Sequence, residues 1–516
     1  MCGIAGYLNF VDRIIDNKKI SQLTESIKHR GPDNNNYWSS KDRKVVLINT
    51  RLAIQDLSNN GNQPFLSQDG RYLIVFNGEI YNFKSLRENL KEFKFKSNSD
   101  TEVLLNLFIK YNKKCLELLE GMFAFAIYDK KKKELFCARD IFGVKPFYYF
   151  FDEKKFCFSS EIKTFINIGF NLKPNKNSVL RYLESEYYDH QTETFYKDIF
   201  KLKPGSYLVI NQYGKKIEKK FFSFDKEYKK IVIPKKDMEK KDLINFLIEK
   251  SVKKSLVSDV PISVATSGGL DSSVLLNSLR NFGEKTKLIS FIFDDQKFSE
   301  EKFVKKIASK KNYNCSFTTI SPKNFKDNIF DSVKILEEPF AGLPIISYLL
   351  CIKKLAKTKV ILDGSGLDEA NCGYDKYMMP NSKKNNLIYA QDGSISVQKN
   401  IIHSYLKQRN NSDVIPRPFE ENFKNEMFSD LFFLKLPRAL RFRDKLSMAY
   451  GKEIRPCFLD KELILTLLKL DTKYHHKDGF GKRILRDIYK NDISSEIAFT
   501  KKRNIQTPQT EWFRNE

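Results

Sequence analysis

The sequence predicts two domains in succession: an α+β antiparallel sandwich, then an α/β domain with a parallel sheet, helices on both faces and a helical C-terminal part. The chain has 516 residues, which is too long for one ordinary core. Up to about residue 222, short apolar runs are separated by Gly, Asn, Asp and Pro, a pattern typical of antiparallel strands. Beyond about residue 240, strand-like and helix-like segments alternate, as they do in parallel sheets.

In the first half, the apolar runs predict strands, and one segment predicts a helix. Thr101–Lys110 has apolar residues at helical spacing. The predicted strands are Val45–Asn49, Tyr72–Phe76, Met122–Tyr128, Leu135–Ala138, Phe147–Phe150 and Ser206–Ile210.

A Lys-rich segment with little periodicity, residues 223–240, predicts a linker between the two domains. After it, the predicted order is helix, strand, Gly-rich turn, helix, strand, helix, strand and strand. These elements are Asp242–Leu256, Pro261–Thr266, the turn, Ser273–Leu279, Leu288–Asp294, Glu300–Ala308, Cys315–Ile320 and Lys359–Asp363. From about residue 400 the pattern is mostly helical.

Composition is that of a globular protein without a membrane span. Hydrophobic residues make up 41% and charged residues 30%, and no apolar run is long enough for a transmembrane helix. The eight cysteines are scattered and the N-terminus has no secretory pattern, so a reducing, cytoplasmic setting is the simplest expectation. The net charge of +26 raises nucleic-acid binding as an option. Lysines alternate with acidic residues along the whole chain without an RNA- or DNA-binding motif, so we attribute the charge to genome composition and expect no nucleic-acid partner.

Cys2 is a candidate nucleophile. It follows Met1 and precedes Gly3, and an initiator Met before a small side chain is normally removed. Removal leaves Cys2 with a free α-amino group, which can act as the base for its own thiol.

Four further segments follow Cys2 in a fixed order: HRGPD at 29–33, RLAI at 51–54, NGEIYN at 77–82 and SDTE at 99–102. Together with MCGI they resemble the class II glutamine amidotransferase domain of asparagine synthetases. The resemblance implies an Ntn-type glutaminase domain over residues 2–222 and a glutamine site. Asn77 and Gly78 are suited to stabilise the oxyanion, and Arg51 and Asp100 to bind the α-carboxylate and α-ammonium of glutamine, with Glu79 and Asn77 also at the glutamine site.

The second motif is a phosphate-binding loop between a predicted strand and a predicted helix. Two glycines let backbone N–H groups approach phosphate oxygens at a helix N-terminus, and the serines add hydroxyl donors. The spacing is not that of a Walker A loop. The loop consists of Ser267, Gly268, Gly269, Leu270, Asp271, Ser272 and Ser273.

This loop resembles that of the PP-loop ATP pyrophosphatases, which cleave ATP between the α- and β-phosphates. Later segments also resemble asparagine synthetases: EEPFA at 337–341, DGSGLDE at 363–369, and RPCFLD at 455–460 with GKRILR at 481–486 in the helical C-terminal part. The resemblance implies a ligase domain over residues 241–516. It assigns Asp271 and Asp368 to Mg²⁺, Gly364 to ATP, and Lys482 and Asp368 to the reacting centre.

The resemblance covers nearly the whole chain and implies a mechanism. Cys2 releases ammonia from glutamine, a carboxylic acid acceptor is activated by ATP as an adenylate, and ammonia crosses a shielded interior route to displace AMP. The expected ligands are therefore glutamine, ATP with Mg²⁺, and the acceptor. A homodimer is compatible with the resemblance, although no interface can be read from the sequence.

Ser365 is a departure from the resemblance. Asparagine synthetases usually carry a Glu between the two glycines of this loop, and a hydroxyl cannot replace that carboxylate as a base. Either Asp363 or Asp368 serves instead, or the acceptor is not aspartate but a uronic-acid sugar of surface polysaccharide synthesis. Leu367 also replaces a small polar residue, and the chain ends where relatives often continue, which leaves the completeness of the helical part open. Two rival classes, a tRNA-modifying PP-loop enzyme and a non-catalytic relative, do not explain the ordered set around Cys2.

Overall fold

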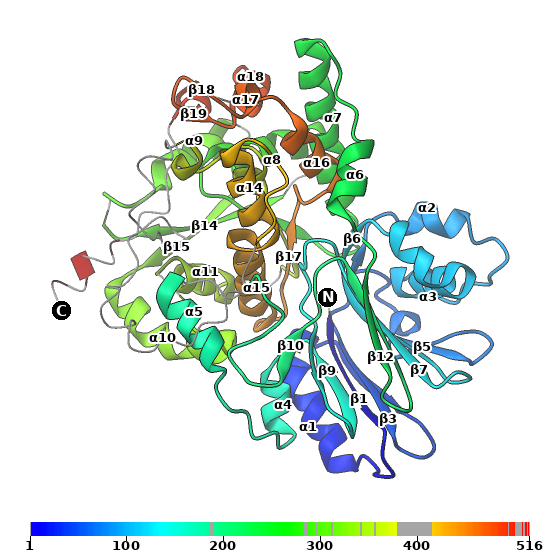
Figure 1. The fold of residues 1–516 in the computed structure, drawn as a ribbon. Helices are drawn as coiled ribbons and strands as arrows, with labels where there is room; N and C mark the ends of the chain where they lie inside the picture. Colours follow the sequence, from blue (N-terminus) through cyan, green and yellow to red (C-terminus); the bar gives the residue numbers. More distant parts are fainter. Residues whose placement is uncertain are drawn as a thin grey trace.

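The computed structural model describes most of the chain. The described residues are 2–185, 189–282, 286–295, 297–310, 313–340, 343–355, 358–378, 415–493 and 495–500, with 508, 511, 512 and 514. Part of the EEPFA segment, residue 341, lies outside them. Figure 1 shows a strand-rich first domain in blue and cyan beside a helix-rich second domain in green to red.

The first domain contains two antiparallel sheets. One sheet has the strand order β10-β8-β9-β1-β3-β2 and the other β12-β11-β7-β6-β5-β4. The strands of the first sheet are β1 (Cys2–Asn9), β2 (Asn34–Ser39), β3 (Val45–Arg51), β8 (Tyr148–Phe151), β9 (Lys155–Ser159) and β10 (Ile199–Lys201). Those of the second are β4 (Phe65–Leu66), β5 (Tyr72–Ile80), β6 (Gly121–Asp129), β7 (Glu134–Arg139), β11 (Ser206–Asn211) and β12 (Lys216–Lys220).

Alternating side chains explain why the two sheets stack. In β1, Ile4 and Leu8 join the core between the sheets, whereas Ala5 and Tyr7 join the core beneath the outer helices. Helices therefore cover both outer faces and produce a four-layer sandwich. These helices are α1 (Asn17–Ile27) and α4 (Lys163–Asn167) on one side and α2 (Phe83–Glu88) and α3 (Asp100–Tyr111) on the other, with α5 (Lys176–Ser185) at the edge. The predicted antiparallel sandwich is confirmed.

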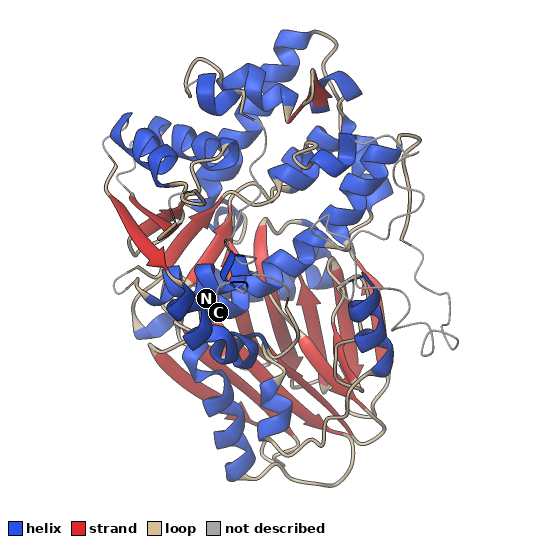
Figure 2. Ribbon diagram, turned by 90° about the vertical axis from the view of Figure 1, so that its left-hand side faces the viewer, coloured by secondary structure: helices blue, strands red, loops and turns tan. Residues whose placement is uncertain are grey.

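The second domain is built on a parallel sheet, as predicted. The sheet has five strands in the order β15-β14-β13-β16-β17, of which the first four had been predicted. Its strands are β13 (Ile262–Ala265), β14 (Lys287–Phe293), β15 (Cys315–Ile320), β16 (Val360–Asp363) and β17 (Glu453–Pro456). The helices of this domain are α7 (Asp237–Ser255), α8 (Leu270–Asn281), α9 (Glu301–Lys310), α10 (Pro322–Leu336), α11 (Leu343–Lys353), α12 (Leu367–Ala370), α14 (Asn422–Phe432), α15 (Lys435–Met448), α16 (Lys461–Lys469), α17 (Thr472–His475), α18 (Arg483–Tyr489) and α19 (Ser495–Ala498). A small hairpin, β18 (His476–Lys477) and β19 (Phe480–Gly481), precedes α18. Figure 2 shows this helix-rich domain above the strand-rich one.

The prediction that RPCFLD lies in a helical segment was wrong. Glu453–Pro456 forms β17, which pairs with β16 in parallel at the edge of the sheet. A strand of four residues that ends at a proline carries too little alternation to be recognised. The consequence is functional, because β17 places Arg455 inside the molecule.

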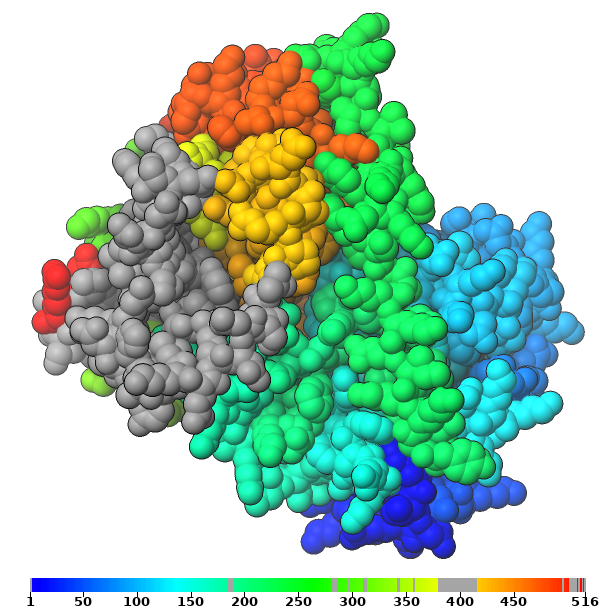
Figure 3. All heavy atoms as spheres, viewed as in Figure 1, coloured from blue at the N-terminus to red at the C-terminus, as the bar shows by residue number. Residues whose placement is uncertain are grey.

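The segment 223–240, expected to be a linker, contains helix α6 (Phe224–Lys230) and the first turn of α7. Phe224 and Tyr228 of α6 stack on each other and meet Phe419 and Phe428 of the second domain edge to face. In Figure 3 this green segment runs over the surface between the two domains. The connection is therefore packed against the second domain.

Candidate functional site

Cys2 and Arg51 face each other across two neighbouring strands. Cys2 begins β1 and Arg51 ends β3, and the antiparallel register pairs them directly. Directly opposed residues share one face of a sheet, so strand pairing alone brings together the predicted nucleophile and the predicted carboxylate-binding cation. Burial raises the pKa of the Cys2 thiol, whereas the nearby chain terminus, the backbone N–H of Leu52 and Arg51 lower it.

Asn77 and Gly78 lie beside Cys2 on strand β5. The main-chain nitrogen of Cys2 donates to Asn77 Oδ1 at 3.2 Å. Asn77 Nδ2 is buried and has no hydrogen-bond partner among the described atoms. A buried donor without a partner lowers the stability of the fold. A bound ligand whose oxygen accepts from Asn77 Nδ2 would explain why this donor is left unpaired. A Cβ atom at Gly78 would lie 2.2 Å from the carbonyl oxygen of Met122, so only glycine fits.

Two carboxylates of the same pocket are held in the interior. Asp100 begins α3, its Oδ2 accepts from the Ile80 N–H at 2.9 Å, and burial raises its pKa to about 6. Glu79 accepts from the side-chain amide of Gln55. Burial raises the pKa of Glu79 well above its ordinary value, even though Arg455 acts against that shift. Asp100 is therefore ionised at neutral pH and available to an ammonium group.

The pocket predicted to bind glutamine is small in this structure. Its cavity has a volume of about 20 Å³, which is room for a single water molecule. The terminal nitrogens of Arg51 donate to Ser58 O and Asn62 Oδ1 at 2.8 Å, to Gln55 O at 3.2 Å and to Asp56 O. The predicted pairing of Arg51 with a carboxylate thus requires the loop around residues 55–62 to move or to yield its hydrogen bonds.

Some pocket residues were not foreseen from the sequence. Gln55, Gln63 and Thr101 line the cavity, and no spacing or motif marks the glutamines. Arg455 comes from the second domain and is fully buried. Its Nη2 lies 3.4 Å from Glu79 Oε1, and its Nε donates to Glu453 Oε1 at 2.5 Å. The RPCFLD segment, which contains Arg455, was the feature of the sequence that could have marked this residue. Its contact with Glu79 is visible only in the tertiary structure.

The predicted phosphate loop connects β13 to α8. Gly268 adopts a φ of +72°, and a Cβ there would lie 2.9 Å from Phe303 Cβ, so the turn requires glycine. Gly269 caps α8. The hydroxyls of Ser272 and Ser273 donate to the Gly269 carbonyl at 3.0 and 2.8 Å and thereby brace the loop. Ser267 and Gly269 are exposed and Leu270 packs in the core, so the outer side of the turn is open to a ligand.

Asp271, Asp368 and Lys482 meet in one ion cluster. Lys482 Nζ lies 2.6 Å from both oxygens of Asp271 and 2.5 Å from Asp368 Oδ1. Burial lowers the pKa of Lys482, but the two carboxylates outweigh it and the net shift is upward. The three residues are separated by up to 211 positions in the chain, yet the sequence assigned each of them to the same chemistry.

Gly364 lies next to the phosphate loop, since β16 and β13 are neighbours in the sheet. A Cβ atom at Gly364 would lie 3.5 Å from Asp271 Cβ. Ser365 follows, and its hydroxyl donates to Asp363. Leu367 is fully buried in the core, which accounts for an apolar side chain at this position.

An apolar cluster extends from the Cys2 pocket into the second domain. Leu52 and Ile54 line the pocket and belong to the same buried cluster as Leu362 of β16 and Phe458 after β17. Met122, on the strand beside Asn77 and Gly78, is also part of it. The interior between the two predicted sites is therefore dominated by hydrocarbon, with Glu79, Arg455 and Glu453 as buried ionisable side chains alongside.

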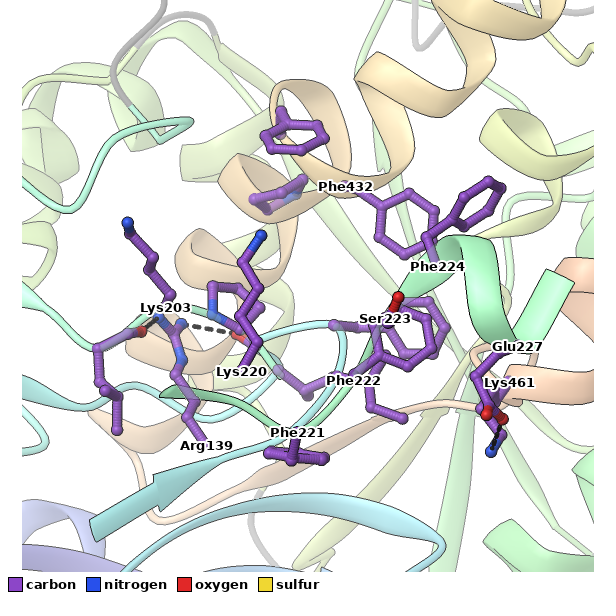
Figure 4. A pocket seen from close by; sticks show the side chains of 18 of the residues that line it. Arg139, Lys203, Lys220, Phe221, Phe222, Ser223, Phe224, Glu227, Phe432 and Lys461 are labelled. Carbon is purple, nitrogen blue, oxygen red and sulfur yellow. Dashed lines mark hydrogen bonds and ion pairs between the residues drawn. The ribbon is translucent and has the colours of Figure 1, made fainter. Parts of the chain in front are cut away.

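A cavity of about 1300 Å³ is lined by none of the predicted site residues. Figure 4 shows Lys203 and Lys220 extending into it, with Phe222, Phe224 and Phe432 around it. The side chain of Arg139 is occupied by backbone carbonyls of Lys145, Leu202 and Gly143 at 2.7 to 2.8 Å. This cavity is separate from both predicted sites.

Two carboxylates of the second domain are the candidate metal ligands. In the described ranges, no three His, Cys, Asp or Glu side chains gather as metal ligands. Asp271 and Asp368 remain as a pair of carboxylates, which suits Mg²⁺, since this ion usually takes one or two carboxylates together with phosphate oxygens and water. None of the helices described here has the length and apolarity to cross a bilayer.

Comparison with known proteins gives two family matches. A model described as a glutamine amidotransferase domain matches residues 1–222, and one described as asparagine synthase matches residues 244–516.

Curated relatives match over most of the chain. "Asparagine synthetase [glutamine-hydrolyzing] 1" of Bacillus subtilis is 29% identical, covering 100% of this chain and 88% of the relative. "Putative asparagine synthetase [glutamine-hydrolyzing] 2" of Methanocaldococcus jannaschii is 33% identical, covering 72% of this chain and 76% of the relative. A protein named "Amidase chry2" of Gibberella zeae is 28% identical over 73% of this chain and 60% of its own length.

Proposed function

Because this chain belongs to the glutamine-hydrolysing asparagine synthetase family, we propose that it converts aspartate, glutamine and ATP to asparagine, glutamate, AMP and pyrophosphate. The family is one of ligases that use glutamine as the nitrogen donor, and members similar to this chain carry that name. The reaction requires two sites, one for each half of the chemistry.

Glutamine hydrolysis is assigned to the first domain. Once Met1 is removed, the main-chain nitrogen of Cys2 is an α-amine that can take the thiol proton. The Cys2 sulfur then attacks the side-chain amide carbon of glutamine, and the oxygen gains negative charge. The free Asn77 Nδ2 and the Gly78 N–H stabilise this oxyanion. The amine returns the proton to the departing ammonia, and water hydrolyses the remaining thioester to glutamate.

Binding of the glutamine backbone is assigned to Arg51, Asp100 and Glu79. The Asp100 carboxylate attracts the α-ammonium, and Arg51 attracts the α-carboxylate when its loop opens. Glu79 marks the inner end of the pocket, where it meets Arg455. These contacts orient the amide toward Cys2 and exclude water by closing the pocket.

Acceptor activation is assigned to the second domain. The backbone of Ser267–Ser273 cradles the pyrophosphate end of ATP, beside Gly364. Asp271 and Asp368 are the residues that would hold Mg²⁺, which would supply positive charge beside the pyrophosphate when bound. Lys482 gives up one of its two carboxylate partners, Asp271 or Asp368, and donates instead to the phosphate of the adenylate, whose negative charge it neutralises.

Transfer of ammonia between the sites is supported by the shared apolar cluster around Leu52, Ile54 and Met122. In such surroundings the charged ammonium form is disfavoured and neutral ammonia retains its lone pair. Ammonia attacks the acyl carbon of the adenylate, AMP departs, and the released proton must be taken by a nearby group.

The observation that carries the proposal is the meeting of Asp271, Asp368 and Lys482 at a single point beside the Gly-rich loop. Pyrophosphate release with Mg-ATP, glutamine and a panel of carboxylic acids tests it. We expect release that depends on aspartate, with one asparagine formed per pyrophosphate. Release only with a uronic acid or its nucleotide sugar, or glutamate formation without any pyrophosphate, would overturn the assignment of aspartate.

A further inference from the structure

The direction of the chain reverses in the parallel sheet between β13 and β16. The chain leaves β13 toward β14 and β15 on one side, then returns to β16 on the other side. In open α/β sheets, ligands bind in the crevice at such a switch point. The loops after β13 and β16 meet here, as the approach of Gly364 to Asp271 shows.

Helix α15 supplies one side chain to this crevice, Arg443. Its Nη1 donates to Asp363 Oδ1 at 3.0 Å, and its side chain is 31% exposed. Helix α15 packs against β17 and α11, so it stands beside the last strands of the sheet (Figure 1). Arg443 has no role in the mechanism described above.

Asp363 Oδ1 gathers three donors. Besides Arg443, it accepts the backbone N–H of Ser365 at 2.9 Å and the hydroxyl of Ser365. A single oxygen thus fixes the guanidinium of Arg443 and the loop residue that replaces the usual Glu. In the described part of the chain, no hydrogen bond is recorded for Asp363 Oδ2 or for Nε and Nη2 of Arg443.

A cation and an anion therefore stand side by side at the acceptor crevice, each with capacity to spare. The Arg443 fork suits a carboxylate, and Asp363 Oδ2 with the lone pairs of Ser365 Oγ suits an ammonium. An α-amino acid presents these two groups on one carbon. A uronic acid carries one carboxylate, which reacts, and offers no ammonium. Tyr348, whose ring lies 5.9 Å from the Arg443 guanidinium, provides a flat apolar wall.

We propose that Arg443, Asp363 and Ser365 form a clamp for the α-carboxylate and α-ammonium of an α-amino dicarboxylic acceptor, leaving its side-chain carboxylate free to attack ATP. The inference rests on the proposed function and specifies its substrate class. In this arrangement Ser365 acts as a positioning residue for Asp363. Asp363 binds the acceptor and does not serve as the base that Glu provides in relatives.

Three acids that differ by one group test the clamp. Succinate is aspartate without the α-ammonium, and β-alanine is aspartate without the α-carboxylate. Steady-state pyrophosphate release by the wild-type protein should show kcat/KM for aspartate at least about tenfold above that for either analogue, the size expected of one charge-assisted hydrogen bond. Similar values for all three acids would overturn the clamp while leaving the ligase reaction standing.

Two variants test the carboxylate-binding and the ammonium-binding parts of the clamp separately. Arg443→Ala should raise the KM for aspartate about ten- to hundredfold and abolish the preference over β-alanine, but keep the preference over succinate. Asp363→Asn should abolish the preference for aspartate over succinate but keep the preference over β-alanine. Glutaminase kcat/KM and the KM for ATP should stay near wild type in both.

Arg438→Ala, on another face of α15, is the matched control and should keep both preferences. Arg443→Ala that still prefers aspartate over β-alanine would contradict the proposal. A wild-type protein inactive with every amino acid but active with a uronate would refute the proposed function itself, which distinguishes the two failures. Thermal unfolding of each variant identifies misfolding, and in that case the wild-type analogue comparison decides.

Discussion

Arg455 Nη2 of the second domain lies 3.4 Å from Glu79 Oε1 of the first, and Glu79 lines the pocket proposed for glutamine. Arg455 also donates to Glu453 and to the carbonyls of Ser255 and Val257. One guanidinium therefore contacts both Glu79, which lines the proposed glutamine pocket, and Glu453 of β17. This contact offers a structural basis for coupling the two reactions.

Arg455→Lys should uncouple hydrolysis from synthesis. An ammonium group keeps the charge but cannot reach Glu79, Glu453 and two carbonyls together, so the domain contact loosens and ammonia escapes. The ratio of glutamate formed to pyrophosphate released should rise from near one to about two or more. Arg417→Lys, at an exposed site, serves as the control. An unchanged ratio in Arg455→Lys would show that the contact is structural only.

Cys2→Ala should remove glutamine-dependent synthesis and leave ammonia-dependent synthesis intact. The nucleophile is lost, whereas the ligase residues lie in another domain. We expect glutamate release to fall at least about a thousandfold, and asparagine formation with ammonium chloride to stay within twofold to threefold of wild type, roughly the spread of an unperturbed site. Cys315→Ala, on β15, is the control thiol. Loss of both activities would point to a structural role for Cys2.

Asn77→Ala should lower the kcat for glutamine hydrolysis about 10²- to 10³-fold with little change in KM, because an oxyanion donor acts mainly in the transition state. The unpaired Nδ2 is the basis of this expectation. Asn82→Ala removes an exposed amide that binds the Leu118 carbonyl and should leave kcat unchanged. A variant in which KM rises and kcat is kept would assign Asn77 to substrate binding instead.

Asp100 predicts a pH dependence of glutamine binding. Its pKa of about 6 means that the carboxyl is neutral at pH 5 and ionised at pH 7. The KM for glutamine should therefore rise as pH falls below 6, and Asp100→Asn should show a high KM that does not vary across this range.

The same shift has a stability consequence. Because the folded pKa lies above the ordinary 3.8, the folded protein binds the proton more tightly, and the stability from this group is present below pH 4 and lost as pH rises through 6. Asp100→Asn should thus match or exceed the wild-type Tm at pH 7. A lower Tm at pH 7, measured by calorimetry, would show that the ionised carboxylate is stabilising.

Lys482→Met should abolish pyrophosphate release, by at least about a hundredfold, and spare glutamine hydrolysis. It removes the cation between Asp271 and Asp368 and leaves two close carboxylates. Lys482→Arg should not restore activity, since a Cβ at neighbouring Gly373 would already lie 2.5 Å from Lys482 Cε, and the larger head group has no room. Full activity of Lys482→Arg would indicate that only the charge is needed.

Much of the fold was predictable because it follows from local patterns. The alternation in β5 and β6 and the strand, Gly-rich turn and helix around Gly268 are legible in the sequence. β17 was not, as its identity as a strand depends on β16 lying beside it. Of the candidate site, the sequence predicted residues such as Cys2, Asp271 and Lys482, but not most of the side chains that they contact. Pairs such as Arg455 with Glu79 and Arg443 with Asp363 depend on tertiary contacts between segments far apart in the chain, which local sequence patterns do not reveal.

The pairing of Cys2 with Arg51 has a wider meaning. The strand that begins with Cys2 places Ile4 and Leu8 in one core and Ala5 and Tyr7 in another, and a shift of one position would exchange those sets. The position of Cys2, the proposed nucleophile, is therefore determined by the strand register formed during folding and not by contacts within the pocket. A chain that has formed the sandwich in this register therefore already holds Cys2 opposite Arg51.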